Sequence, residues 1–269
     1  MKIALKIAYL GESYHGFQCQ PDQVTVELVI RRALQNLELS PGGFSYAGRT
    51  DRGVSALGQV VAFEIDSEKR KMAAPRVINT RLPGDVWAWA SAVVPDHFSA
   101  RRSALWRRYR YFLYSVGLDL DSIQEAASAL IGTHDFKNFS KEKRMSTRRE
   151  VMSLALEERA GFVIVDIKAD SFLWEMVRRI AGALAMIGSG EKDAGWIYDL
   201  LDPERNIGVA PAPPDGLILM EVGYPEIVWD SDSYAKKRAS LMLSKKMKSQ
   251  LQRGEVMREL LFSIGGSPK

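Results

Sequence analysis

The sequence has very little cysteine and histidine. Cys19 is the only cysteine among 269 residues, so no internal disulfide can form, which is typical of proteins in a reducing compartment. His15, His97 and His134 are scattered and have no ligand-like spacing with Cys19, so the sequence predicts no zinc site. We therefore expect a cytoplasmic protein without a structural metal.

Long hydrophobic runs are also missing, although 46% of the residues are hydrophobic. No apolar run approaches the roughly 18 residues that a membrane span needs. Lys2 and Lys6 interrupt the start of the chain, which shows no signal-peptide pattern. We expect no membrane contact and enough apolar residues for one or two cores.

The net charge of +4 is confined to the end of the chain. Nine Lys or Arg and five Asp or Glu follow position 225, and the 28 basic and 28 acidic residues before it cancel. A neutral body excludes bulk electrostatics as the whole basis of nucleic-acid binding. Local basic clusters must then make any such contact.

One polar loop stands out between two apolar runs. A Gly-Arg-Thr-Asp segment at 48–51 follows the short run at 44–47 and precedes an alternating run at 61–65, both typical of strands. Arg49 and Arg52 flank the carboxylate of Asp51. Loops held by a sheet often carry chemistry, but a surface turn with a salt bridge explains the same spacing.

The first hundred residues follow the order strand, helix, strand, strand, helix, strand. Residues 2–10 alternate like a half-buried strand, Thr25 is placed to cap a helix, and residues 86–94 form a strand. This order predicts a ferredoxin-like unit. Such folds support many functions, so the order does not decide between them.

Arginines and aromatic residues alternate from 101 to 114. Five arginines and no acidic residue lie between Arg101 and Arg110. A period of two places Tyr109 on one face of a strand and Arg108 and Arg110 on the other. Rings can stack on unpaired bases and guanidinium groups can bind phosphates; the alternative is an amphipathic strand with solvated arginines.

Further along, a basic segment at 137–149 carries six basic residues and one Glu. A strand pair follows around Gly161, and then a helical stripe with Arg178 on its flank. Glu175 and Arg179 are four residues apart and are expected to pair on that helix.

Residues 47–60 resemble the active-site segment of the TruA family of tRNA pseudouridine synthases. Similar family segments occur in the same order at 14–21, 107–111, 171–182 and 210–219, so the resemblance runs from about residue 2 to Tyr224. The chain departs from the family pattern at Ser55, Trp174, Glu175 and Arg179.

The resemblance implies an enzyme that isomerises uridine in tRNA without a metal or redox cofactor. It implies that the catalytic residues are Asp51, Tyr109 and Arg178, with Asp51 ionised and Arg178 beside it. Tyr109 would stack on the uracil, and Arg49 would fill the gap left by a flipped nucleotide. The residues expected to contact RNA are Arg49, Thr50, Arg52, Gln59, Tyr14, Phe17, Arg107, Arg108 and Arg110.

The resemblance also implies a fold, a substrate position and a partner. The expected fold is α+β, with two ferredoxin-like or RRM-like halves sharing a central, mostly antiparallel sheet, helices on one side and the active-site cleft on the other. Residues 1–100 would form the first half, 101–224 the second, and 225–269 a basic helical extension. The substrate would be uridine at positions 38–40 of the tRNA anticodon stem-loop, and the enzyme a homodimer.

Two rival functions are compatible with parts of the pattern. One is a catalytically silent RNA-binding protein, which would have no reason to keep Asp51, Tyr109 and Arg178 together. The other is a phosphate-transferring Asp enzyme, which would need a second acidic metal ligand, and the 48–59 loop region contains none.

Residues beyond 225 predict a basic helix that ends before Gly254. Apolar residues recur every four positions from Ala235 to Leu251, with lysines between them. Such a helix could contact RNA phosphates, or it could stabilise the body or a dimer, and the sequence leaves both open.

Overall fold

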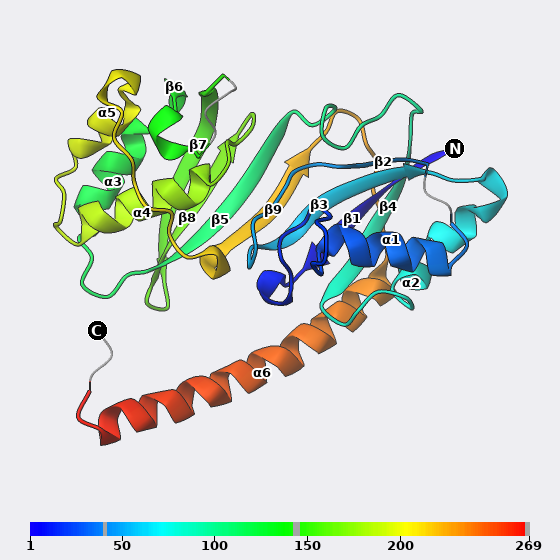
Figure 1. Cartoon of the computed structure of the whole chain (residues 1–269). Helices are drawn as coiled ribbons and strands as arrows, with labels where there is room; N and C mark the ends of the chain where they lie inside the picture. Colours follow the sequence, from blue (N-terminus) through cyan, green and yellow to red (C-terminus); the bar gives the residue numbers. More distant parts are fainter. Residues whose placement is uncertain (40–41, 142–145, 267–269) are drawn as a thin grey trace.

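A computed structural model describes residues 1–39, 42–141 and 146–266. The N-terminal half contains β1 (Lys2–Tyr9), η1 (Gly11–Ser13), α1 (Val26–Asn36), β2 (Gly42–Tyr46), β3 (Ser55–Glu64), η2 (Ser67–Ala73), α2 (Pro75–Ile78) and β4 (Val86–Val94) (Figure 1). Thr25 caps α1 as expected, because its side chain accepts a hydrogen bond from the amide of Leu28 at 3.3 Å.

The second half repeats a similar order. It contains β5 (Trp106–Tyr114), α3 (Leu120–Ala129), β6 (Gly132–Asp135), η3 (Lys137–Phe139), β7 (Arg148–Arg159), β8 (Phe162–Ala169), α4 (Met176–Gly188), α5 (Trp196–Leu201), η4 (Pro203–Arg205), η5 (Pro214–Gly216) and β9 (Leu217–Gly223). Part of the basic segment at 137–149 lies outside the described residues. The short strand β6 within this half was not predicted.

One large sheet connects the two halves. Its strand order is β10-β4-β1-β3-β9-β5-β8-β7-β6, with β2 paired to β3 beside this path; β10 is Asp230–Ser231. Strand pairs within each half are antiparallel, and the halves meet where β3 and β9 run parallel, with Ser55 opposite Ile218. The expected mixed α+β fold with a mostly antiparallel sheet is confirmed.

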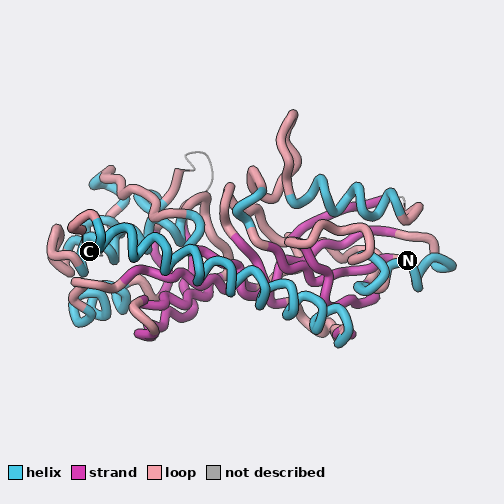
Figure 2. The backbone as a smooth tube through the Cα atoms, turned by 90° about the horizontal axis from the view of Figure 1, so that it is seen from below, coloured by secondary structure: helices cyan, strands magenta, loops and turns pink. Residues whose placement is uncertain are grey.

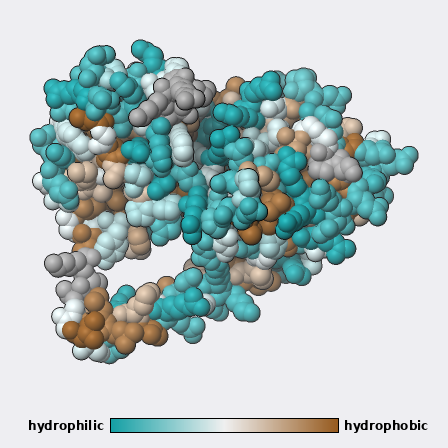
Figure 3. Space-filling view, viewed as in Figure 1, coloured by the Kyte–Doolittle hydropathy of each residue, from teal (hydrophilic) through white to brown (hydrophobic). Residues whose placement is uncertain are grey.

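A long C-terminal helix, α6 (Ser233–Ser263), leaves this sheet. It starts beneath the N-terminal half and ends beneath the C-terminal half (Figure 2). Open space separates its far end from the body, and that end is coloured as hydrophobic (Figure 3). The helix continues through Gly254, so the prediction that it ends before this residue is wrong. None of the described helices is both long and apolar enough to cross a membrane.

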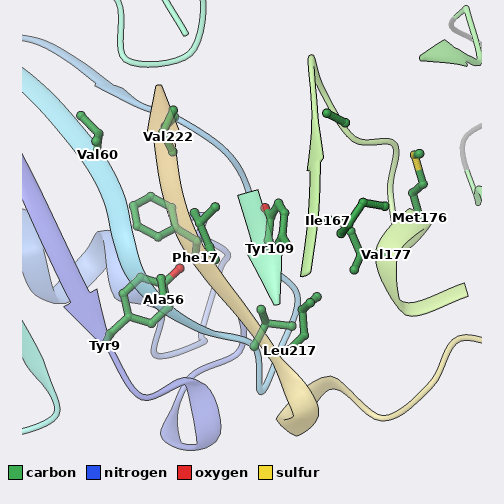
Figure 4. Close-up of a cluster of buried hydrophobic side chains, with 14 of the residues drawn as sticks. Tyr9, Phe17, Ala56, Val60, Tyr109, Ile167, Met176, Val177, Leu217 and Val222 are labelled. Atoms are coloured by element: carbon green, nitrogen blue, oxygen red, sulfur yellow. The ribbon is translucent and has the colours of Figure 1, made fainter. Parts of the chain in front are cut away.

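Burial alternates along β5 as the sequence predicts. Tyr109, Tyr111 and Leu113 are buried, whereas Arg108, Arg110 and Phe112 on the other face are only partly covered. Tyr109 lies in one apolar layer with Ile167 of β8 and with Met176 and Val177 of α4 (Figure 4). The helix α4 therefore covers the face of β5 that carries Tyr109.

Candidate active site

The loop that carries Asp51 connects β2 to β3 and reaches the border between the two halves. Gly53 adopts a left-handed conformation there (φ 85°), which favours glycine, and a Cβ at this position would lie 3.0 Å from the Pro214 ring. The carbonyl of Asp51 accepts a hydrogen bond from the amide of Val54 at 3.2 Å. This tight turn directs the Asp51 side chain toward the C-terminal half.

Both carboxylate oxygens of Asp51 accept hydrogen bonds from that half. The Arg178 Nη1 donates to Oδ2 at 2.9 Å, and the Trp174 Nε1 donates to Oδ1 at 3.1 Å. The side chains of Asp51 and Arg178 are 27% and 13% exposed, so solvent screens this ion pair only in part. Two donors on two oxygens fix both the position and the rotation of the carboxylate.

Arg178 is itself held at the start of α4. Its Nε donates to the carbonyl of Ala212 at 2.8 Å, and its own carbonyl accepts from the amide of Ala212 at 2.9 Å. The residue before the helix, Glu175, has a left-handed backbone (φ 65°), and its carboxylate pairs with Arg179 at 2.6 Å, as the spacing predicts. This strained residue sits between Trp174 and α4, where it redirects the chain so that both donors reach Asp51.

Tyr109 lies beneath the loop that carries Asp51. Its hydroxyl would be 3.9 Å from a Cβ placed on Gly48, and its ring packs edge-on against Phe172 with centroids 5.0 Å apart. Burial raises the pKa of Tyr109 to about 12, while the Arg107 charge lowers it and the Asp51 charge raises it. The phenol is therefore protonated at neutral pH. The structure thus brings the three expected catalytic residues to one place.

Thr50 and Gln59 support the loop from inside the protein. The Thr50 hydroxyl is hydrogen-bonded to the buried Tyr9 hydroxyl at 2.8 Å. Gln59 is fully buried and donates from Nε2 to the carbonyl of Gly48 at 2.8 Å. Neither side chain is available to RNA, which corrects the prediction that they contact it.

Tyr14 and Phe17 are also buried. The Tyr14 hydroxyl donates to Asp85 at 2.6 Å, and the ring of Phe17 packs on Tyr46 with centroids 4.8 Å apart. The amide of Phe17 donates to the carbonyl of Thr50 at 3.0 Å. These aromatic residues anchor the loop instead of facing RNA, so the prediction of direct contact is corrected for them too.

The expected RNA-binding arginines separate into three settings. Arg49 and Arg52 are exposed, and neither forms an ion pair or hydrogen bond with the described residues. Arg107 is partly buried and donates to the carbonyls of Ala47, Arg101 and Asp170, so it braces the base of the loop.

Arg108 and Arg110 point to the other face of the sheet. There they pair with Asp166, at 3.6 Å and 2.7 Å. They cannot contact a nucleotide that is bound at Asp51, because the sheet lies between. Any RNA contact they make must be on that far face.

The position of the site corrects one feature of the expected fold. Arg178 belongs to α4, and Tyr109 lies on the face of β5 that α4 covers. The residues that meet Asp51 are therefore on the helix-bearing side of the sheet, so the prediction of a cleft on the side opposite the helices is wrong. The site lies where the two halves meet.

Trp174 is a hydrogen-bonding partner of Asp51 that the sequence did not predict. The indole is 52% exposed, Lys141 Nζ lies 4.9 Å from its ring centroid, and the Trp174 carbonyl accepts a hydrogen bond from the Lys141 amide. The available signal was the departure from the family pattern at this position, which introduces an N–H donor four residues before Arg178.

Comparison with known proteins adds an independent line of evidence. A family model described as tRNA pseudouridine synthase matches residues 126–225. The tRNA pseudouridine synthase A of Methanothrix thermoacetophila is 54% identical over 261 residues, covering 97% of each chain. The proteins of the same description from Methanosarcina acetivorans and Thermococcus kodakarensis are 46% and 40% identical, each over 97% of this chain and 99% of the relative.

These matches include most of residues 225–269, which corrects the expectation that the resemblance ends near Tyr224. Among solved structures, a Cbf5-Nop10-Gar1 complex overlaps 81% of this chain and 58% of the other at 14% identity. The TM-score of 0.39 is too low to carry a conclusion.

Proposed function

The chain belongs to the tRNA pseudouridine synthase A (TruA) family and has that activity, and from this premise we propose that Asp51 is its essential residue and uridines 38–40 of the anticodon stem-loop are its substrates. The observation that supports Asp51 is its carboxylate, which a guanidinium and an indole hold at both oxygens. The choice of uridines 38–40 comes from the family resemblance.

The reaction breaks the N1–C1′ bond, rotates the uracil and joins C5 to C1′, after which the C5 proton leaves. N1, which has lost its bond to C1′, takes up a proton in exchange for the one lost from C5, so the composition of the nucleotide is unchanged. Asp51 would act as a nucleophile, or would stabilise charge at the sugar, in its ionised form. Arg178 would favour that form by its positive charge. Attack at C1′, attack at C6 and abstraction of the C2′ proton all use the same carboxylate.

Tyr109 would assist from below the loop. A phenol that keeps its proton can donate a hydrogen bond to the uracil, or relay the C5 proton by giving up its own as it receives another. Stacking of uracil on the ring requires movement of Phe172 or of the loop at Gly48, since the ring is only 8% exposed.

Arg49 and Arg52 would bind the RNA around the flipped nucleotide. They are the two arginines beside Asp51 that are exposed and have no protein partner among the described residues. Extruding a base costs a few kcal/mol of stacking, which an inserted arginine and phosphate contacts can offset.

We also infer the remaining family properties for this chain. Each half is a ferredoxin-like unit, because its main elements follow the order strand, helix, strand, strand, helix, strand. The four main strands lie side by side as β4-β1-β3-β2 in the first half and as β9-β5-β8-β7 in the second. The units span about residues 1–100 and 101–224. From the tRNA substrate and the family resemblance we infer that the enzyme acts in the cytoplasm, as a homodimer.

Pseudouridine mapping tests the proposal. Unmodified tRNA is incubated with the purified protein, and each position is scored for pseudouridine. We expect modification within positions 38–40, and none with Asp51→Asn, which removes the charge with little change in shape. Turnover of this variant within about tenfold of wild type would remove Asp51 from the chemistry. Bound but unmodified tRNA with the wild-type protein would instead indicate a silent RNA-binding protein.

A further inference from the structure

The first two-thirds of α6 carry basic residues and no acidic ones. We call residues 233–253, which lie between Asp232 and Glu255, the basic arm. Its seven basic residues are Lys236, Lys237, Arg238, Lys245, Lys246, Lys248 and Arg253. The rest of the chain contains 30 basic and 33 acidic residues, so without the arm the protein would have a net negative charge. The positive charge of this protein is therefore concentrated on one helix.

Most of this charge is not neutralised inside the protein. Among the described residues, Lys246 is the one member of the seven that forms an ion pair, and its partner is Glu12. Lys237, Lys245 and Lys248 are exposed, and their side chains form no hydrogen bond or ion pair with the part of the chain that the structure describes. Holding several unpaired cations along one helix costs repulsion, which a polyanionic ligand would remove.

The unpaired lysines lie on the open side of the helix. Ala235 is buried against the body and Lys246 pairs with it, and these residues are eleven positions apart, which is about three helical turns. Lys237 and Lys248 are also eleven positions apart, each two residues further along the chain, so they are turned by about 200° from the attached side. Lys245 lies next to them, three residues before Lys248. These three side chains form one basic stripe that faces away from the body.

The arm passes close to the loop that carries Asp51. Glu12, the partner of Lys246, belongs to η1, and in the same short helix the Gly11 amide donates to the Ser55 hydroxyl at 3.1 Å. Ser55 follows Asp51 by four residues. The helix α6 then continues from beneath the N-terminal half to beneath the C-terminal half, so it crosses below the border at which the site lies (Figure 2). A ligand much larger than one nucleotide can therefore contact the site and the arm together.

We propose that the basic arm binds the phosphate backbone of the tRNA substrate, outside the nucleotide that enters the site. This inference rests on the proposed function, which supplies a polyanionic substrate. The site itself offers few free cations, because Arg107 is bonded to backbone carbonyls and Arg108 and Arg110 pair with an aspartate. Arg49 and Arg52 alone leave most of the contact with a large RNA unexplained, and the arm supplies the missing charge.

An anionic membrane surface is the other polyanion that attracts basic helices. Helices that lie on membranes separate their apolar residues from their basic residues, one kind on each side. In the arm the two kinds are mixed, because Leu241 lies between Lys237 and Lys245 at spacings of four on the same side. The pattern therefore favours RNA, and the membrane becomes an outcome of the test.

The test neutralises the basic stripe in the full-length protein. Lys237→Gln, Lys245→Gln and Lys248→Gln are combined, and α6 should persist because glutamine and lysine have similar helix propensities. Each phosphate contact steepens the log–log dependence of binding on salt by about 0.7–0.9. We expect the slope for tRNA to become less steep by about two to three, and the affinity near 0.15 M salt to fall roughly 10- to 100-fold. The single-turnover rate at saturating enzyme should stay at the wild-type value, since the arm does not touch the reacting atoms.

Two companion variants separate phosphate contact from other effects. Arginine at the same three positions keeps the charge and should keep both the slope and the affinity. Arg32→Gln, Arg70→Gln and Lys71→Gln together remove the same charge from exposed residues of α1 and η2, and this control should bind like wild type. Thermal melting verifies that every variant folds.

The glutamine variant decides the proposal. A slope and an affinity equal to those of wild type would overturn it. An equal loss in the control variant would also overturn it, because net charge alone would then explain the effect. Lysine-dependent binding to vesicles of phosphatidylcholine and phosphatidylserine, at unchanged tRNA affinity, would identify a membrane surface instead. Absence of pseudouridine from positions 38–40 with wild type would count against the proposed substrate positions, and the salt slopes would still decide whether the arm binds tRNA.

Discussion

Arg178→Gln tests whether the ion pair between Arg178 and Asp51 orients the Asp51 carboxylate for the proposed chemistry. The change removes the donor that lies 2.9 Å from Asp51 Oδ2 and leaves a neutral side chain that is too short to replace it. Hydrogen bonds to charged groups contribute about 1.5–3 kcal/mol. Breaking a fully buried ion pair costs about 3–5 kcal/mol. The Asp51 side chain is 27% exposed, so solvent screens this pair in part, and we expect Arg178→Gln to lose about 2–3 kcal/mol.

If this energy is lost from the transition state, the rate falls by about 30- to 150-fold, at 1.36 kcal/mol per factor of ten. The assay is single-turnover pseudouridine formation at saturating enzyme, which separates chemistry from tRNA binding and product release. Binding itself should change little, because Arg178 is only 13% exposed.

Arg76→Gln is the matched control. It removes another Arg–Asp pair of 2.9 Å, which connects α2 to Asp232 at the start of α6, away from the site. This variant should lose stability without losing rate. A rate constant for Arg178→Gln within about threefold of wild type, or an equal loss in both variants, would refute the orienting role.

Three further outcomes are expected. Tyr109→Phe should keep tRNA affinity and lose rate, because only the hydroxyl is removed; an unchanged single-turnover rate would exclude the hydroxyl from the mechanism. Trp174→Phe keeps a ring but removes the donor to Asp51, so the rate should fall by about tenfold at unchanged melting temperature, and equal rates would mean that Arg178 alone orients the carboxylate. Stability should decline as the pH rises above about 10, because buried tyrosines keep protons that the unfolded chain has already lost. Each contributes up to about 1.4 kcal/mol per pH unit, and urea unfolding between pH 9 and 11 measures the slope. The tyrosines whose pKa burial raises are Tyr9, Tyr14, Tyr109, Tyr111 and Tyr224.

The sequence predicts the elements of this fold better than the contacts between them. Alternation identified β1 and β3, and the cap at Thr25 identified the start of α1, since these signals are local. The continuation of α6 through Gly254 was missed, because one glycine costs too little to stop a long helix. The side of the sheet that bears the site depends on how the two halves join, and no local pattern contains that information.

The same limit applies to the site residues. Asp51, Tyr109 and Arg178 were found through their family segments, and the structure places them together. Polar character alone could not show that Arg49 is exposed and Gln59 buried, because both are polar residues near Asp51 in the sequence. Trp174 was noted only as a departure, since its contact with Asp51 joins residues 123 positions apart.

Because the two halves meet at the short parallel pairing of β3 with β9, the rate of the reaction should depend on whether this pairing is intact. Ser55 and Ala56 enter this pairing only four residues after Asp51, and the partners of Asp51 lie beyond it in the other half. A slight opening at this boundary would separate the carboxylate from both donors while each half kept its own core. On heating or on addition of denaturant, pseudouridine formation should therefore be lost before circular dichroism detects unfolding of either half.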